Sequence, residues 1–248
     1  MAVIVPFIRS GLPASNGNTL NLECATGGTV VPRAVHHLNS IMTTLKLTYF
    51  DFHGGRAEPV RLALHLGGIA FDDHRFPGAE FAAIRKGVPL GQVPVLEVDG
   101  VQVTQSDAIL RYAGKLAGLY PSDDVQALLC DEILAGVEDA SNQVGKSFGL
   151  TGDALKEART VLVEGPLPKY LSWLQHQLQA HGGTFFADGR MTIADLKVFV
   201  FVRGLTSGVM DHVPKDLVER LAPAVHAHAQ RVLQTESIRQ YYARHGVA

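Results

Sequence analysis

The 248-residue sequence is poor in the residue types that define several large classes of protein. Its two cysteines, Cys24 and Cys130, are too few for a disulfide scaffold or a cysteine-rich zinc site. Because it has 22 basic and 24 acidic residues, the chain lacks the excess of positive charge that nucleic-acid binding usually requires. No apolar run reaches the roughly 18 residues of a membrane-spanning helix, and the run at 198–202 is flanked by Lys197 and Arg203. We therefore expect a globular protein of a reducing compartment, without a nucleic-acid or membrane partner.

The first 41 residues differ from the rest of the chain. They contain only Arg9, Glu23 and Arg33 as charged residues and keep no helical or strand period. Three interpretations are open: a poorly structured tail, an organelle transit peptide, or upstream sequence outside the mature protein. The short apolar opening has no basic region before it and is broken by Pro6, which argues against a secretory signal. We expect residues 1–41 to lie outside the fold, as a tail or an over-extended start.

Residues 42–120 carry the mixed pattern of a small α/β domain. Leu45, Leu47 and Tyr49 alternate with polar or exposed positions, which predicts a strand. Asp99-Gly100 predicts a tight hairpin turn between two further strands. The expected elements are a strand at 45–50, a helix at 57–66, a strand at 71–76, a helix at 80–86, strands at 95–98 and 101–104, and a helix from Ser106 whose buried face is Ile109, Leu110, Tyr112, Ala113 and Leu116.

Residues 125–248 read as an all-helical domain. The breaker-rich segment 118–124 marks the boundary, and no strand-like alternation of useful length follows Thr104. Helices are expected at 125–143, with Leu128, Leu129, Ile133 and Val137 at three-to-four spacing, and at 168–180, 192–202, 216–232 and 237–244. Thr192 and Asp195 fit a capping box that begins one of them.

Four short motifs occur in a specific order and spacing. They are Leu-Thr-Tyr-Phe at 47–50, Gly-Arg-Ala-Glu at 55–58, Gly-Gln-Val-Pro-Val-Leu at 91–96, and Gln105-Ser106. With them the chain resembles the cytosolic glutathione transferases of the tyrosine type, and the sigma class most closely. The resemblance extends from Met42 to about the C-terminus. It implies a thioredoxin-like domain followed by a helical bundle domain, in agreement with the α/β and all-α patterns.

The resemblance makes Tyr49 the candidate catalytic residue. A tyrosine at a strand end is usually a core or surface residue, but here the family motif surrounds it. A thiol with a pKa of about 8.5 is only a few per cent ionised at neutral pH, and a hydroxyl that donates to the sulfur stabilises the anion. The arginine that the family usually has near His53 is absent, and one extra residue is present at Gly54-Gly55. We therefore expect Arg56 to support Tyr49 electrostatically.

The resemblance also implies a glutathione site. Val93 would pair its backbone with the cysteinyl part of glutathione, ahead of a cis bond to Pro94. Gln105 and Ser106 would hold the γ-glutamyl carboxylate, with Ser106 also acting as the N-cap of its helix. Asp107 is expected to stabilise that helix rather than to bind ligand. The acidic pair Glu138-Asp139 implies that Asp139 reaches the site of a neighbouring subunit.

Other candidate positions depart from the family pattern. Phe81 occupies the position of a tryptophan whose indole N–H helps to hold the glycyl end, a bond that phenylalanine cannot donate. Arg85 replaces a lysine and retains the charge for the glycyl carboxylate. Phe50 and Gln92 complete the expected glutathione site. The expected electrophile pocket between the domains is lined by Phe52, Val144 and Phe148.

Several other sequence features are interpreted as structural rather than as binding or catalytic sites. Residues 140–147 match a relaxed phosphate-loop pattern, but they follow a helical segment where such a loop needs a strand. His36-His37 and 226–228 lack a matching second cluster, so surface histidines are expected rather than a metal site. Cys130, on an apolar helix face, is expected to be buried.

The resemblance thus implies a homodimeric, cytoplasmic detoxification enzyme that conjugates reduced glutathione to hydrophobic electrophiles and needs no metal or organic cofactor. Two alternatives stay open. The same thiolate serves glutathione-dependent isomerases and peroxidases, and some relatives are non-catalytic carriers or structural proteins. A redox module is weaker, because no cysteine lies near the Tyr49 turn.

Overall fold

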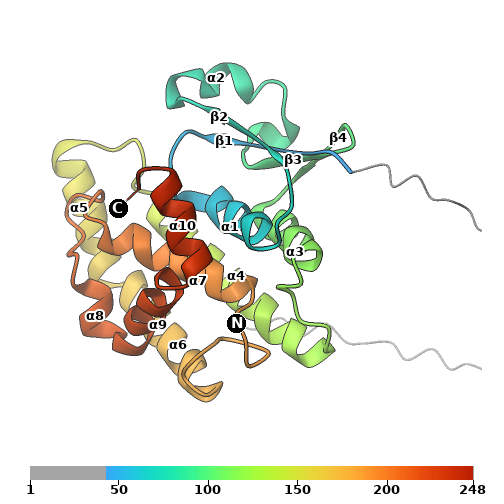
Figure 1. Ribbon diagram of the computed structural model, residues 1–248. Coiled ribbons are helices and arrows are strands. Elements are labelled where there is room, and N and C mark those ends of the chain that lie inside the picture. The colour runs from blue at the N-terminus through green and yellow to red at the C-terminus, as the bar shows by residue number, and fades with distance from the viewer. Residues whose placement is uncertain (1–42, 248) are drawn as a thin grey trace, which may run out of the picture. The chain divides into compact units, whose positions relative to one another are not determined.

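The computed structural model describes residues 43–247, and the segment 1–41, with Cys24 and His36-His37, lies outside them. Within the described part, a sheet has the strand order β2-β1-β3-β4 (Figure 1). Strand β1 runs parallel to β2 and antiparallel to β3, and β3 forms the predicted hairpin with β4. The strands are β1(Leu45–Phe50), β2(Asp72–Phe76), β3(Val95–Val98) and β4(Val101–Thr104).

Strand β1 is the centre of this first domain. Its side chains alternate between buried and half-buried, so that Leu45, Leu47 and Tyr49 enter the core as predicted. Two helices, α1 and α3, cover the face of the sheet turned towards the other helices, and α2 lies on the opposite side (Figure 1). The helical segments here are η1(Gly55–Ala57), α1(Glu58–Leu66), η2(Gly78–Glu80), α2(Phe81–Ile84), η3(Pro89–Gly91) and α3(Ser106–Leu116).

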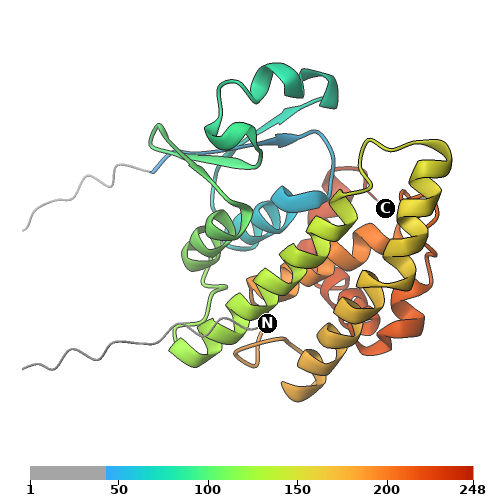
Figure 2. The same cartoon turned by 180° about the vertical axis from the view of Figure 1, so that it is seen from behind.

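The second domain is helical, and α7 runs through its core. Helix α7 packs against α1 of the first domain and against α4 and α9 of its own (Figures 1 and 2). Nearly every side chain from Ile193 to Leu205 is buried, including Lys197. The helices are α4(Asp124–Gly145), α5(Gly152–Glu164), α6(Pro166–Ala180), α7(Ile193–Thr206), α8(Leu217–Leu221), α9(Pro223–Leu233) and α10(Glu236–Arg244). Of the residues described, none forms a helix long and apolar enough to cross a bilayer.

The start of α7 is fixed by the predicted capping box. The Asp195 carboxylate accepts hydrogen bonds from the backbone N–H and hydroxyl of Thr192, at 2.8 and 2.9 Å. Its other oxygen lies 2.9 Å from Nε2 of His228, which is buried. The prediction of a surface histidine at 228 is therefore wrong, because this imidazole satisfies a carboxylate that is itself fully buried.

Three further predictions about the helices were wrong or incomplete. Helix α5 was not predicted, and the expected helix at 216–232 is divided into α8 and α9. The division falls at Ala222, because Pro223 begins α9 and cannot continue the hydrogen bonding of α8. Leu116, expected to be buried, is 47% exposed, and Leu128, one of the regularly spaced apolar residues of α4, is 67% exposed. Apolar spacing identifies a helix face, but burial also needs a neighbouring element against that face.

A close helix–helix contact at Gly136 gives a test of this packing. A Cβ atom there would lie 2.4 Å from the ring of Trp173 on α6, so Gly136→Ala forces the helices apart. We expect it to lower the free energy of unfolding by about 1–3 kcal/mol, the usual cost of overpacking a core. The matched control is Gly204→Ala in α7, where a Cβ atom meets nothing within 4 Å and should be neutral or stabilising. Equal effects in chemical denaturation would contradict this packing.

Candidate functional site

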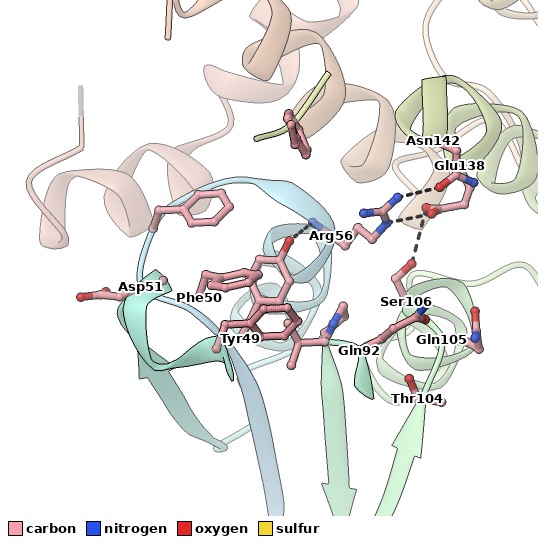
Figure 3. Close-up of a pocket in the computed structure, with 16 residues that line it drawn as sticks. Tyr49, Phe50, Asp51, Arg56, Gln92, Thr104, Gln105, Ser106, Glu138 and Asn142 are labelled. Carbon is pink, nitrogen blue, oxygen red and sulfur yellow. Dashed lines mark hydrogen bonds and ion pairs between the residues drawn. The ribbon is translucent and has the colours of Figure 1, made fainter. Parts of the chain in front are cut away.

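A cavity of about 740 Å³ lies beyond the carboxyl end of β1 and is lined by residues of both domains (Figure 3). The predicted site residues that line it are Tyr49, Phe50, Phe52, Arg56, Phe81, Gln92, Val93, Pro94, Gln105, Ser106 and Phe148. Three predicted residues are absent from its lining: Arg85, Asp139 and Val144. The cavity therefore gathers side chains from segments as distant in sequence as β1 and the end of α4.

Tyr49 places its hydroxyl in this cavity from the end of β1. The side chain is otherwise buried, and its hydroxyl oxygen accepts a hydrogen bond of 3.2 Å from the backbone N–H of Arg56. The turn approaches the phenol so closely that a Cβ atom on Gly55, which has a φ of 64°, would lie 2.6 Å from that oxygen. Glycine is therefore needed at position 55 for two reasons, the positive φ and the close approach of the Tyr49 hydroxyl.

The protonation state of Tyr49 follows from this environment. Burial raises the pKa of Tyr49, while the Arg56 N–H and the charges of Arg56 and Arg61 oppose it in part. The net result is a pKa above the ordinary value for tyrosine, so the phenol is neutral at physiological pH. Because the oxygen accepts from Arg56, its own hydrogen remains available to a partner in the cavity.

The guanidinium of Arg56 is directed at α4 and makes its hydrogen bonds there. Its Nε donates to Oε1 of Glu138 and its Nη2 to Oδ1 of Asn142, both at 2.8 Å (Figure 3). The charge of Arg56 acts to lower the pKa of Tyr49, in line with the expected electrostatic support, while the direct hydrogen bond to the phenol comes from the Arg56 backbone. The side chain also joins the two domains at the edge of the cavity.

Among the lining residues that sequence reasoning missed, Asp51, Gly78, Thr104, Glu138 and Asn142, Glu138 accepts hydrogen bonds from both Arg56 and Ser106. Burial opposes its ionisation, but Lys197 and Arg56 outweigh that effect together and lower the pKa of Glu138. Of the pair Glu138-Asp139, the prediction chose Asp139, which is exposed on α4. The signal was the polar pair Glu138 and Asn142, four residues apart and therefore on one face of the helix.

The start of α3 forms another wall of the cavity. Helix α3 begins at Ser106, and the N-cap position is held by Gln105, whose φ is 77°. Ser106 is therefore the first residue of the helix rather than its predicted N-cap. Its hydroxyl donates to Oε2 of Glu138 at 3.5 Å. Opposite it, the peptide bond between Val93 and Pro94 is cis, as predicted.

The remaining predicted residues fall into two groups. Phe50 packs its ring 5.1 Å from that of Phe81, and Phe52 and Phe148 expose large parts of their rings at the cavity. Arg85 places its guanidinium 5.5 Å from the centre of the Phe81 ring, outside the cavity lining. Val144 lies in the hydrophobic core, so its prediction as an electrophile contact is wrong.

The phosphate-loop match and Cys130, which were interpreted as structural features, have structural roles. Residues 140–145 are the last turns of α4 rather than a loop after a strand, which rules out the phosphate-loop geometry. Cys130 is fully buried as predicted, and burial raises the pKa of its thiol to about 11. Between residues 43 and 247, His, Cys, Asp and Glu do not gather in a group able to hold a metal ion.

Comparisons with known proteins agree with this architecture. Residues 56–116 match the family model of the glutathione S-transferase N-terminal domain, and residues 138–245 match that of the C-terminal domain. A glutathione S-transferase of Anopheles gambiae is 31% identical over 204 residues, which cover 82% of this chain and 97% of that protein.

Solved structures support the same assignment. The prostaglandin synthase D of Nilaparvata lugens has a TM-score of 0.72 at 30% identity, covering 81% of this chain and 97% of that one. The sigma class glutathione transferase of Fasciola hepatica has a TM-score of 0.70 at 28% identity, covering 82% and 96%. The predicted fold class, a thioredoxin-like domain followed by a helical domain, is confirmed. The chain belongs to the glutathione S-transferase family and is sigma-like.

Proposed function

We propose that this protein conjugates reduced glutathione to hydrophobic electrophiles, with the Tyr49 hydroxyl donating a hydrogen bond to the glutathione sulfur. The observation that carries the proposal is the geometry of that hydroxyl in the cavity. Its oxygen accepts from the Arg56 N–H at 3.2 Å, and burial keeps the phenol protonated. A neutral donor fixed in this way stabilises a thiolate more than a thiol, since hydrogen bonds to anions are the stronger ones.

The catalytic gain comes from ionisation and proximity. A free thiol with a pKa of about 8.5 is mostly protonated at neutral pH, so lowering that pKa enlarges the nucleophilic fraction. Holding thiolate and electrophile in one cavity makes their reaction effectively unimolecular. This chemistry uses glutathione as the co-substrate, and we propose that no metal or organic cofactor takes part in it.

The arrangement of the cavity walls suggests how glutathione lies. The γ-glutamyl carboxylate fits the amino end of α3, where Gln105 and Ser106 line the cavity and free backbone N–H groups favour an anion. The cysteinyl backbone fits Val93, which lines the cavity ahead of the cis bond. The glycyl end then points towards Phe81, with the Arg85 guanidinium 5.5 Å from the centre of that ring.

An apolar electrophile fits the remaining wall. Phe52 from the first domain and Phe148 beyond α4 expose 47% and 64% of their surface and both line the cavity. Burial of such rings against a ligand is favourable at about 25 cal/mol per Å² of apolar area.

A glutathione-dependent isomerase is the second candidate, and the comparisons supply its support. The hematopoietic prostaglandin D synthase of Gallus gallus is 43% identical over 98 residues, covering 40% of this chain and 49% of that protein. A panel of endoperoxide, hydroperoxide and aryl-halide substrates separates the isomerase, peroxidase and transferase activities. Tight glutathione binding without turnover on the panel would favour a non-catalytic carrier.

We also propose a homodimer in the cytoplasm. Leu90, Val101 and Leu128 are large apolar residues that are mostly exposed, as a surface covered by a second copy would be. Asp139 is exposed on α4 and is proposed to reach the amine of glutathione bound to the other subunit.

Replacing the catalytic hydroxyl tests the proposal. Tyr49→Phe removes one charge-assisted hydrogen bond, so we expect kcat/KM for an aryl-halide electrophile to fall about 10- to 100-fold. Glutathione affinity, measured by calorimetry, should change little. Tyr170→Phe on α6 is the control and should keep full activity. Undiminished turnover in Tyr49→Phe would contradict the assignment, and absence of glutathione binding in the unaltered protein would contradict the function itself.

The glycyl end gives a second prediction. Phe81→Trp restores an N–H donor at the cavity wall, and one hydrogen bond to a carboxylate should raise glutathione affinity about tenfold. Phe148→Trp adds the same indole at the electrophile side and serves as the matched control, without a gain in glutathione affinity. The glutathione affinity of both variants is measured by calorimetric titration. Equal affinities in the two would show that the glycyl end does not lie at Phe81.

A further inference from the structure

Lys197 is a buried cation that lies between two carboxylates of different domains. Its side chain is 8% exposed and comes from α7, the helix that packs against both domains. The ammonium forms an ion pair with Asp107 in the first turn of α3 and lies 3.1 Å from Oε2 of Glu138 on α4. Neither Lys197 nor Asp107 lines the cavity.

The contacts of Lys197 continue into the cavity through Glu138. The other oxygen of Glu138 accepts from Arg56 Nε at 2.8 Å, and the Arg56 backbone N–H reaches the Tyr49 hydroxyl. The oxygen that faces Lys197 also accepts from the Ser106 hydroxyl. Figure 3 shows Arg56 and Ser106 approaching Glu138 from two sides. One carboxylate thus holds both the turn behind the catalytic phenol and the amino end of α3.

We propose that Lys197 is a positioning residue of the glutathione site: it fixes Glu138, and through Glu138 it sets Arg56 and Ser106 for binding and ionising glutathione. This inference rests on the function proposed above. It assigns a role in the reaction to a residue on the core helix that touches neither glutathione nor electrophile.

The electrostatics of the cluster explain why the cation is needed. Burial and the charge of Glu138 raise the pKa of Asp107, and burial also opposes the ionisation of Glu138. Lys197 opposes these effects at both carboxylates, Arg56 does so at Glu138, and Arg111 does so more weakly at Asp107. Without Lys197, Glu138 would lose the ammonium that holds its Oε2 and would keep only Arg56 and Ser106. Its carboxylate would then turn towards solvent and release them.

A charge-balanced variant separates positioning from folding. Lys197→Met alone leaves Asp107 without its ion-pair partner and Glu138 with Arg56 alone, so it tests the full effect but also endangers the fold. The double variant Asp107→Leu with Lys197→Met removes one charge of each sign, so the local net charge is unchanged. Arg111→Met is the matched control, because it breaks another ion pair between α3 and α4, Arg111 to Asp131 at 2.6 Å, away from the cavity.

The measurement is the ultraviolet absorbance of the thiolate of bound glutathione, titrated against pH at saturating glutathione. In the double variant we expect the pKa of the bound thiol to rise by about one pH unit, equivalent to tenfold less thiolate well below that pKa. The pH profile of kcat/KM should shift upwards with it. In Arg111→Met, a similar loss of thermal stability should leave the thiol pKa where it was.

The possible results are distinct. A raised thiol pKa in the double variant but not in Arg111→Met supports positioning by Lys197. An unchanged thiol pKa in the folded double variant overturns the proposal. An equal shift in Arg111→Met also overturns it, because Lys197 would then act only as an ion pair between the domains. If the unaltered protein shows no thiolate signal with glutathione, the proposed function fails, and this inference fails with it.

Discussion

The ion pair between Arg56 and Glu138 holds the two domains together where the cavity forms. Arg56 follows the glycine turn after β1, and Glu138 lies on the long helix α4, so the contact fixes the turn against the helical domain. The Tyr49 hydroxyl is held by the same turn, through the Arg56 backbone. The position of the phenol therefore depends on packing between domains as well as on the strand that carries it.

This dependence explains why the buried helix α7 carries a charge. A lysine in the core is costly to bury unless its partners are carboxylates, and Lys197 has Asp107 and Glu138. The two acids come from α3 and α4, and the cation comes from α7. Electrostatic balance at one point thus joins three helices. The same point borders the proposed binding region for the γ-glutamyl group.

Much of the fold could be predicted from the sequence, because local rules are strong where elements are short and periodic. The alternation around Tyr49 and the Asp99-Gly100 turn located the strands, and the Thr192 capping box located the start of α7. The exposure of Leu128 could not be predicted, since a helical period does not say which neighbours are present. Of the candidate site, motifs identified the residues near β1, β3 and α3. Glu138 was not predicted, because its role depends on contacts with residues distant in sequence.

The central claim is that this cavity binds glutathione and ionises its thiol. The most direct measurement is a spectroscopic pH titration of glutathione bound to the unaltered protein, compared with free glutathione. We predict that the bound thiol has a pKa at least about one unit below the value of about 8.5 for a free thiol, because the Tyr49 hydroxyl donates to the anion. A bound thiol with an unshifted pKa, or no binding at all, would contradict the account.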